Sequence, residues 1–408
     1  MEVLYSRCAG LDVHRDTVVA CARIAEGNRI RHDVEQFGTT TTELRRLRDW
    51  LISHGCTHVV MEATGVYWKP VWNVVHGAAE LLLANAAHVK NVPGRKTDVN
   101  DATWLSDLLA HGLVRASFVP DKPAQELRAL LRTRKQLVRE KGQHVQRIEK
   151  VLQDANLKLT STVSNIMGQS GRAILQALIG GESDPDRLLA LTTGRLKASR
   201  SELREALRGH VTTHHRFLLK LHLEQIAHLE SAILNIDQEV GHGLDPFRAQ
   251  VALLVTIPGV GDLMAQVIVS EIGTDMTRFP SAGHLISWAG LCPRNDESAG
   301  KRRSTRLRKG APWLKTQLVQ AAWCATRAKR TYLRAQFLRL KARRGPRKAI
   351  MAVAASMLTA IYYMLRDGVA YQDLGPDYFD RLEHGKILRR LVRKIEDLGY
   401  DINIKRVA

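Results

Sequence analysis

Four acidic residues stand at positions from which their carboxylates could act together on one substrate. Two of them, Asp98 and Asp101, lie three residues apart at the start of a predicted helix, residues 96–111 (KTDVNDATWLSDLLAH). Residues three apart share one face of a helix, so we expect both carboxylates to point the same way. Neighbouring carboxylates repel one another unless a cation lies between them, and a divalent metal ion commonly fills that role. Acids also favour the first turn of a helix, so this pair alone does not decide between the two explanations.

The other two acids belong to short apolar segments. Residues 9–13 (AGLDV) and 57–62 (THVVME) have the pattern of buried strands, with Asp12 inside the first and Glu62 at the end of the second. Burying a carboxylate in such a strand is costly unless a partner group is present. Carboxylates that meet at one sheet edge can hold two Mg²⁺ ions about 4 Å apart, the arrangement that serves phosphodiester chemistry. The sequence therefore predicts a site for one or two Mg²⁺ ions with the ligands Asp12, Glu62, Asp98 and Asp101.

The elements that must position these acids follow a recognisable order. Hydrophobic spacing predicts three strands joined by hairpins, then helix, strand, helix, strand and helix. The predicted strands are residues 9–13, 17–23, 29–37, 57–62 and 81–84, and the first helix is residues 42–54. An α/β RNase H-like fold requires this order, with a mixed sheet and helices packed on its faces. We expect such a domain at residues 1–122.

Residues 123–245 are predicted to form a helical spacer. Residues 123–159 and 199–240 are charged and carry apolar residues at helical spacing, and a stretch rich in Ser, Thr and Gly, residues 160–181, lies between them. We interpret the two segments as an antiparallel, coiled-coil-like pair that serves dimerisation or holds nucleic acid.

Residues 246–370 are predicted to form a mainly helical domain that binds DNA. Residues 253–273 have a helix-hairpin-helix pattern, although such a hairpin can also be a plain helical turn. Residues 298–366 contain 18 Lys and Arg and no Asp or Glu, which phosphate contact explains better than a solvated face does. The residues expected to bind nucleic acid are Gly259, Gly261, Lys301, Arg302, Arg303, Arg306, Arg308 and Lys309.

The overall composition is typical of a cytoplasmic protein with a polyanionic partner. The chain has 408 residues, too many for one ordinary core, and a formal net charge of +20, which predicts binding to nucleic acid. Its five cysteines include no C-x-x-C pair and are expected to be reduced thiols. The N-terminus lacks a signal-peptide pattern, and the apolar residues 349–365 fall short of the roughly 20 that a membrane span needs. We expect a buried helix there and no membrane contact, and residues 371–408 form a C-terminal tail without an assigned role.

Several motifs occur in an order that one family shares. They are GLDVH from Gly10, VVMEATG from Val59, KTDVNDA from Lys96, IPGVG from Ile257 and FPSAGHLISWAGLCPRNDESAGK from Phe279. With this combination the chain resembles the DEDD transposases of the bacterial insertion-sequence-110 family, over nearly all of its length to about residue 350.

The resemblance implies a fold, a reaction and partners. It implies a RuvC-like domain with the acids named above as metal ligands, and a C-terminal transposase domain whose nucleophilic serine, by motif position, is Ser298. It also implies a recombinase guided by a structured non-coding bridge RNA that pairs with donor and target DNA, working as a homo-oligomer, a dimer or tetramer. The chain has Ser298-Ala299-Gly300-Lys301 where many members have Ser-Gly-Gly-Lys, and the extra methyl group restricts this loop.

Ser298 has charged neighbours that suit phosphate chemistry. A serine hydroxyl is a weak nucleophile at neutral pH and needs a base or a metal ion to take up its proton. Ser298 follows two acids and precedes Lys301 and two arginines, so charge that stabilises a phosphorane-like transition state lies beside it in sequence. Ser304 is the alternative nucleophile, and a purely structural role for Ser298 in a basic loop is the alternative function.

Three functions are compatible with the pattern of acids. The first is a transposase or site-specific recombinase that cuts and rejoins DNA. The second is a RuvC-like, metal-dependent endonuclease that hydrolyses DNA without strand transfer. The third, an ATPase of the sugar-kinase and actin superfamily, needs a phosphate turn rich in Gly and Ser or Thr after Asp12, and the residues there, Val-His-Arg-Asp, include no glycine. A covalent protein–DNA product would separate the first function from the second.

Overall fold

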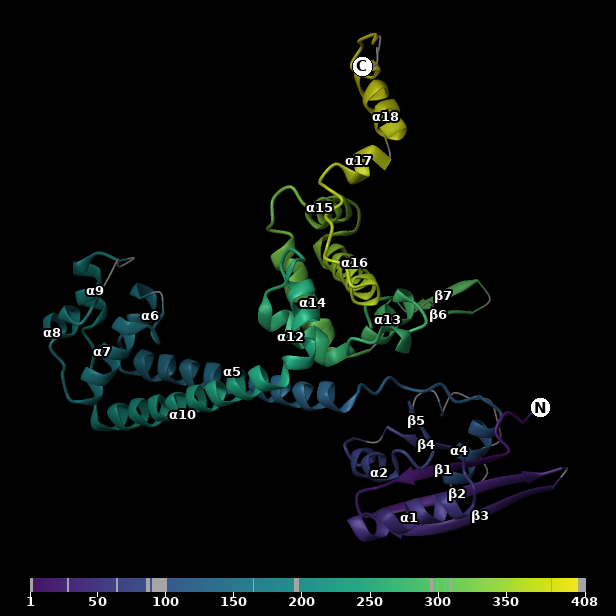
Figure 1. Ribbon diagram of the computed structural model, residues 1–408. Helices are drawn as coiled ribbons and strands as arrows, with labels where there is room; N and C mark the ends of the chain where they lie inside the picture. The colour runs from purple at the N-terminus through teal and green to yellow at the C-terminus, as the bar shows by residue number, and fades with distance from the viewer. Residues whose placement is uncertain are drawn as a thin grey trace. The chain divides into compact units, whose positions relative to one another are not determined.

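The computed structural model describes residues 3–27, 29–63, 65–85, 89, 101–163, 165–193, 198–293, 296–298, 300–304, 306–307, 310–382 and 384–402. The chain divides into two compact units, Met1–Val119 and Pro120–Ala408. The first unit contains the large β-sheet and the second is built mainly from helices (Figure 1).

A mixed five-stranded sheet forms the centre of the first unit. Its strands are β1 (Arg7–Val13), β2 (Thr17–Glu26), β3 (Arg29–Gly38), β4 (His58–Glu62) and β5 (Glu80–Ala84), in the spatial order β3-β2-β1-β4-β5. The strands β1, β2 and β3 pair antiparallel, whereas β4 runs parallel to β1 and β5 parallel to β4. The predicted order of strands and helices is found, and the sheet is compatible with an RNase H-like domain.

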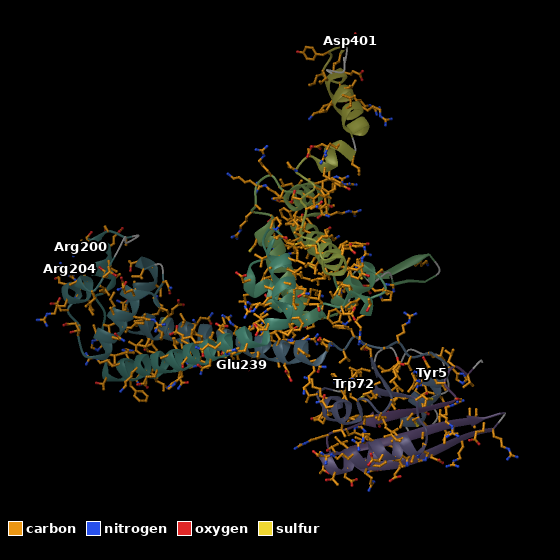
Figure 2. The ribbon with its side chains drawn as sticks, in the orientation of Figure 1. Tyr5, Trp72, Arg200, Arg204, Glu239 and Asp401 are labelled. Atoms are coloured by element: carbon orange, nitrogen blue, oxygen red, sulfur yellow. The ribbon has the colours of Figure 1, made fainter. Side chains whose placement is uncertain are left out.

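Helices cover both faces of this sheet. Helix α1 (Thr41–Ser53) begins after Thr40, whose hydroxyl accepts a hydrogen bond from the N–H of Glu43 and so caps the helix. Leucines three and four residues apart turn its apolar face to the core that also contains α2 (Trp68–Val75). The other face of the sheet packs on α4 (Asp101–Ala110) through a second apolar cluster. Figure 2 labels Trp72, on α2, and Tyr5, ahead of β1. The ring of Trp72 packs against that of Trp68, and the ring of Tyr5 against that of His58.

Two long helices form an antiparallel pair in the second unit. They are α5 (Lys122–Asp154) and α10 (Thr213–Gly243), which run side by side in Figure 1. In the first half of α5, Arg134 pairs with Asp237 near the end of α10 at 3.0 Å, and at the last residue of α5 Asp154 lies 2.9 Å from His215 near the start of α10. These contacts confirm that the two helices run in opposite directions.

The prediction of one continuous helical segment from residue 199 is wrong. Helix α9 (Arg200–Ala206) ends, and α10 begins anew at Thr213 behind a capping box formed by Thr212 and His215. The side chains of this box accept hydrogen bonds from backbone N–H groups, which fixes the start of a new helix at this point. The spacing of apolar residues alone predicts a helix without this break.

The stretch expected to be loose also contains folded elements. Helices α6 (Leu159–Thr162), α7 (Gln169–Ile179) and α8 (Pro185–Ala190) pack with α9 against the ends of α5 and α10 around a buried apolar core. Apolar residues spaced three and four apart on short helices are enough to build this core, although Ser, Thr and Gly dominate the connections.

The remainder of the second unit packs around one apolar helix, α16 (Pro346–Asp367). Its neighbours include α11 (Arg248–Val255), α13 (Ala282–Ala289), α14 (Pro312–Ala325) and α15 (Tyr332–Arg344). Among the described residues, α16 alone is long and apolar enough to cross a membrane, and half of its most apolar stretch is buried within the protein. The other elements are α12 (Asp262–Ile272), the 3₁₀ turns Asp245–Phe247 and Met276–Arg278, β6 (Asp296–Ser298), β7 (Lys301–Ser304), α17 (Tyr378–Leu382) and α18 (His384–Glu396).

Candidate active site

Asp12 and Glu62 occupy neighbouring positions at one end of the two central strands. Strands β1 and β4 are parallel with Leu11 opposite Met61, so the next residues along them are these two acids. Aligned residues of adjacent strands point to the same face of a sheet. The Asp12 side chain is 22% exposed, and its Oδ2 lies 3.1 Å from Nε2 of His14, within hydrogen-bond distance. The structure thus brings together two acids that are far apart in the chain.

Helix α4 runs along β1 in the opposite direction. The N–H of Leu4 donates to the carbonyl of Ala110 at 2.8 Å, at the last residue of the helix. Further along the strand, the thiol of Cys8 lies 3.5 Å from the carbonyl oxygen of Ser106, one turn closer to the helix start. Later residues of the strand therefore lie opposite earlier residues of the helix. Asp101, the first residue of α4, therefore lies toward the acidic end of the sheet.

Gly10 is the point at which α4 approaches the sheet most closely. A β-carbon at this position would lie 2.1 Å from the carbonyl oxygen of Ala102 and 2.6 Å from the backbone nitrogen of Ser106. Non-bonded heavy atoms do not approach so closely, so only glycine fits here. This role of Gly10 was not predicted from the sequence, although a glycine inside an apolar strand commonly marks a close backbone approach.

An ion pair between a buried arginine of β2 and a partly exposed aspartate also holds α4 onto the sheet. Arg23 of β2 is only 1% exposed, and its Nε donates to Oδ1 of Asp107 on α4 at 2.8 Å. Nε2 of His32, on β3, lies 3.1 Å from the same oxygen. Sequence reasoning missed this network, and the available signal was an arginine inside the apolar run of β2.

The chemistry of the donor set fits a divalent metal ion. Asp12 and Glu62 occupy aligned positions of adjacent strands on one face of the sheet, and in the described part of the chain neither is ion-paired with a lysine or arginine. Adjacent carboxylates without a compensating cation favour a bound cation, and oxygen ligands of this kind suit Mg²⁺. Asp98 lies outside the described residues. Within them, no group of three or more His, Cys, Asp or Glu side chains is gathered closely enough to hold a metal ion.

Ser298 lies at the end of a strand, directly before a tight turn. Strands β6 and β7 form an antiparallel hairpin in which Ser298 is opposite Lys301. Gly300 between them has φ +73°, a left-handed conformation that favours glycine. The hairpin therefore places the backbone of the serine next to that of an exposed lysine. The side chains of Ser298, Arg302 and Arg303, and the whole of Arg308 and Lys309, lie outside the described residues, whereas Arg306 is exposed.

The two glycines of the predicted helix-hairpin-helix have different surroundings. Gly259 has φ +86°, and a β-carbon there would lie 2.4 Å from the backbone nitrogen of Ala325 in α14. This close packing is itself a sufficient reason for a glycine. Gly261 is exposed, immediately precedes α12 and has open space around its α-carbon, so the first N–H groups of α12 can be approached from solvent.

Comparison with known proteins finds matches to two family models. Residues 9–157 match a model described as a transposase, of the DEDD type from IS110 elements, and residues 251–338 match the transposase IS116/IS110/IS902 family. The first range contains all four predicted metal ligands, and the second contains both hairpin glycines and Ser298.

Two curated relatives are similar to parts of the chain. The "Insertion element IS110 uncharacterized 43.6 kDa protein" of Streptomyces coelicolor is 34% identical over 128 residues, 30% of this chain and 31% of the relative. The "Putative transposase y4rJ" of Sinorhizobium fredii is 25% identical over 272 residues, 62% of this chain and 61% of the relative. The chain thus matches less than two thirds of the length of each relative.

Proposed function

The chain belongs to the IS110 family of transposases, and we propose that it is a DNA transposase that cuts DNA strands and rejoins them to new partners. One observation carries this proposal. Asp12 and Glu62 are neighbours at one end of the sheet, and Asp101, the first residue of α4, lies toward the same end. An acidic edge of this kind suits phosphodiester chemistry, and the acid-free basic stretch at residues 298–366 suits binding of the phosphate backbone.

We assign the acidic edge as the metal site of a RuvC-like domain, with Mg²⁺ held by Asp12, Glu62, Asp98 and Asp101. When bound, Mg²⁺ polarises a phosphate oxygen and lowers the pKa of an attacking hydroxyl. The protein's own contribution is to hold the carboxylate oxygens in place. Strand pairing fixes Asp12 beside Glu62, the missing side chain of Gly10 lets α4 approach, and His14 contacts only one of the two Asp12 oxygens, Oδ2.

Ser298 is the proposed nucleophile. Its Oγ attacks a DNA phosphorus, the bond from that phosphorus to one DNA oxygen breaks, and the serine proton ends on the departing oxygen. The products are a phosphoserine link to one DNA end and a free hydroxyl on the other. Attack by a hydroxyl of another DNA end reverses the step, joins the strands and regenerates serine, so rejoining needs no ATP. Lys301, opposite Ser298 in the hairpin, supplies positive charge for the transition state.

The partners in this proposal are DNA and a guide RNA. The N-terminus of α12 at Gly261 and the basic residues from Lys301 to Lys309 would contact phosphates. The guide RNA is the structured bridge RNA that the family resemblance implies. Catalysis requires the acidic edge and the serine hairpin to act on one phosphodiester, supplied by one chain or by two chains of a dimer or tetramer.

Recombination in cells tests the proposal without knowledge of the target sequence. The chain is expressed together with its own element, and excised or newly joined DNA junctions are measured by amplification across them. Asp12→Asn is expected to abolish the junctions. The matched control is Asp16→Asn, because Asp16 is an acid in the same region that is 85% exposed, and this variant is expected to keep them.

Two outcomes would contradict the proposal. Junction formation at the wild-type level by Asp12→Asn would exclude the acidic edge as the catalytic site. DNA breaks that depend on Asp12 but never yield joined products would favour the metal-dependent endonuclease instead.

A further inference from the structure

A pocket of about 530 Å³ opens between α15, α16 and the segment that follows α16. Its walls are mostly apolar and include three aromatic rings, those of Tyr332, Tyr363 and Tyr371. Sites for small organic groups usually have volumes of roughly 300–1,000 Å³ and apolar walls with a few polar atoms. This tyrosine pocket is therefore large enough to admit one planar aromatic ring system.

A network of hydrogen bonds around Asp373 fixes one wall of the tyrosine pocket. Its Oδ1 accepts from the N–H of Tyr332 at 2.9 Å and from the N–H of Gly375 at 2.8 Å, and its Oδ2 accepts from the hydroxyl of Tyr371 at 3.3 Å. The N–H of Tyr371 also donates to Oγ1 of Thr256 at 2.9 Å. Because these bonds hold the wall in place within the protein, binding costs little ordering of this wall.

The polar atoms in the pocket suit the edge of a nucleobase. Oγ of Ser356 accepts from Nε2 of Gln336 at 2.8 Å, which leaves the Ser356 hydroxyl hydrogen able to donate. Thr359 uses its hydrogen on the carbonyl of Ala355 at 3.0 Å, which leaves its Oγ1 able to accept. One donor and one acceptor among apolar walls match a planar ring with polar groups on its edge.

The charge around the pocket favours a ligand that carries phosphate. The guanidinium of Arg366 lies 4.7 Å from the ring centroid of Tyr363, and that of Arg339 lies 4.8 Å from the ring centroid of Phe379. Arg366 is also ion-paired with Asp367. Helix α15 and α16 up to Arg366 belong to the acid-free residues 298–366, and the carboxylate of Asp373 is engaged by the three hydrogen bonds described above. Tyr363 is 44% exposed, which leaves part of its ring open to stacking.

We propose that the tyrosine pocket binds an unpaired nucleobase of a nucleic-acid strand, stacked on Tyr363 and held at its edge by Ser356 and Thr359. The inference rests on the proposed nucleic-acid binding of the second unit and adds a site that reads a base rather than the backbone. Single-stranded DNA and unpaired RNA share this chemistry. A fully paired duplex does not offer a free base face, so it lies outside the specificity of the pocket.

Binding of short oligonucleotides to the full-length protein tests the proposal. The probes are a DNA strand and an RNA strand, each with one fluorescent 2-aminopurine base, and a blunt DNA duplex. Tyr363→Ala is expected to weaken binding of an unpaired strand roughly 5- to 150-fold, the range expected for one lost base–aromatic stack, and to remove the quenching of 2-aminopurine. Tyr363→Phe keeps the ring, so it is expected to keep the affinity for the unpaired strand and the quenching of 2-aminopurine. The affinity for the duplex is expected to stay unchanged in Tyr363→Ala and in Tyr363→Phe. The arm with the larger loss, DNA or RNA, identifies the source of the base.

Two further variants make the test specific. Tyr400→Ala removes an exposed tyrosine outside the pocket, and we expect it to bind every probe as the wild type does. Val369→Glu places a carboxylate at an exposed position of the lining, and we expect it to weaken binding of unpaired strands even if Tyr363→Ala fails to fold. Unchanged affinity for unpaired strands in Tyr363→Ala or Val369→Glu, with normal duplex binding, would overturn the pocket assignment alone. A wild-type protein that binds none of the probes would instead overturn the proposed nucleic-acid function.

Discussion

Asp12 and Glu62 are neighbours across the parallel pair β1–β4, one residue beyond the contact between Leu11 and Met61. The strand pairing brings these two acids together, although β2, β3 and α1 separate them in the chain. Their adjacency therefore depends on the register of β4 and on the helix that covers the same face. We therefore expect substitutions that disturb this packing to change the geometry of the acidic edge, even when they leave both carboxylates in place.

Gly10→Ala should damage both stability and recombination. The added methyl group would overlap the carbonyl oxygen of Ala102, so α4 must move away from the sheet. Overpacking of this kind usually lowers the free energy of unfolding by about 1–3 kcal/mol. Since α4 carries Asp101 at its start, we also expect recombination to fall far more than the lost stability explains. Urea denaturation and the junction assay measure the two effects.

The control for this prediction is another glycine-to-alanine change. Gly142 lies inside α5 with open space around its α-carbon, so Gly142→Ala should raise the free energy of unfolding by up to about 1 kcal/mol. A Gly10→Ala protein as stable and as active as the wild type would show that α4 does not need this close approach.

The basic stretch should control how nucleic-acid affinity depends on salt. Each lysine or arginine that neutralises a phosphate adds about one unit to the slope of log affinity against log salt concentration. Removing the arginines of this stretch should therefore flatten the slope for every sequence tested. The variant carries alanine at Arg302, Arg303, Arg306 and Arg308. The control variant carries alanine at Arg187 and Arg204, which are already paired with acids, and it should keep the wild-type slope. An unchanged slope in the variant of the basic stretch would mean that its four arginines do not bind phosphate.

Glu271 neutralises two arginines where α5 meets α12. Its side chain is 2% exposed, and Arg132 donates to both of its carboxylate oxygens at 2.8 Å. Burial lowers the pKa of the nearby Arg128 to about 10, and the charge of Glu271 opposes that change. Glu271→Gln should therefore leave buried positive charge uncompensated and lower the free energy of unfolding by about 3–5 kcal/mol in urea denaturation.

A surface pair provides the comparison. Asp245 pairs with Arg248 at 2.8 Å where both side chains are largely exposed, so Asp245→Asn should change the free energy of unfolding by less than about 1 kcal/mol. Equal effects of the two substitutions would mean that the buried pair contributes no more than an exposed one.

The histidine pair between α5 and α10 should make stability depend on pH. Nδ1 of His144 lies 3.3 Å from Nδ1 of His222, and Arg147 lies 3.4 Å from the other nitrogen of His144. Burial, and then the charges of His144 and Arg147, lower the pKa of His222 below its ordinary value of 6.5. As the pH falls, His222 therefore binds a proton in the unfolded chain before it does so in the folded protein. The contribution of His222 to the free energy of unfolding is present above about pH 6.5 and is lost as the pH falls below that value.

Urea midpoints at about pH 7.5 and about pH 5.5 test this prediction. We expect the wild-type midpoint to fall between these two values by more than that of His222→Gln, which cannot titrate at this position. The same pH dependence in both proteins would assign the effect to other histidines.

The sequence was sufficient to predict the sheet that carries the acidic edge, and it was not sufficient where tertiary contacts decide. Apolar runs and hairpins predicted β1 to β5, and an acid inside or at the end of a buried strand singled out Asp12 and Glu62. The break between α9 and α10 was missed because it depends on one capping box and not on hydrophobicity. The pair formed by Arg23 and Asp107 was missed because its two residues lie 84 positions apart, and nothing local to either residue indicates the other.

The proposed chemistry depends most directly on whether DNA becomes covalently attached to Ser298. The measurement is trapping of labelled element DNA on the protein under denaturing conditions, in the presence of Mg²⁺. We predict that the wild type and Ser304→Ala form the adduct and that Ser298→Ala does not. Asp12→Asn should also fail, because in the proposed mechanism the acidic edge and the serine act on the same phosphodiester. An adduct formed by Ser298→Ala at the wild-type level would contradict the account.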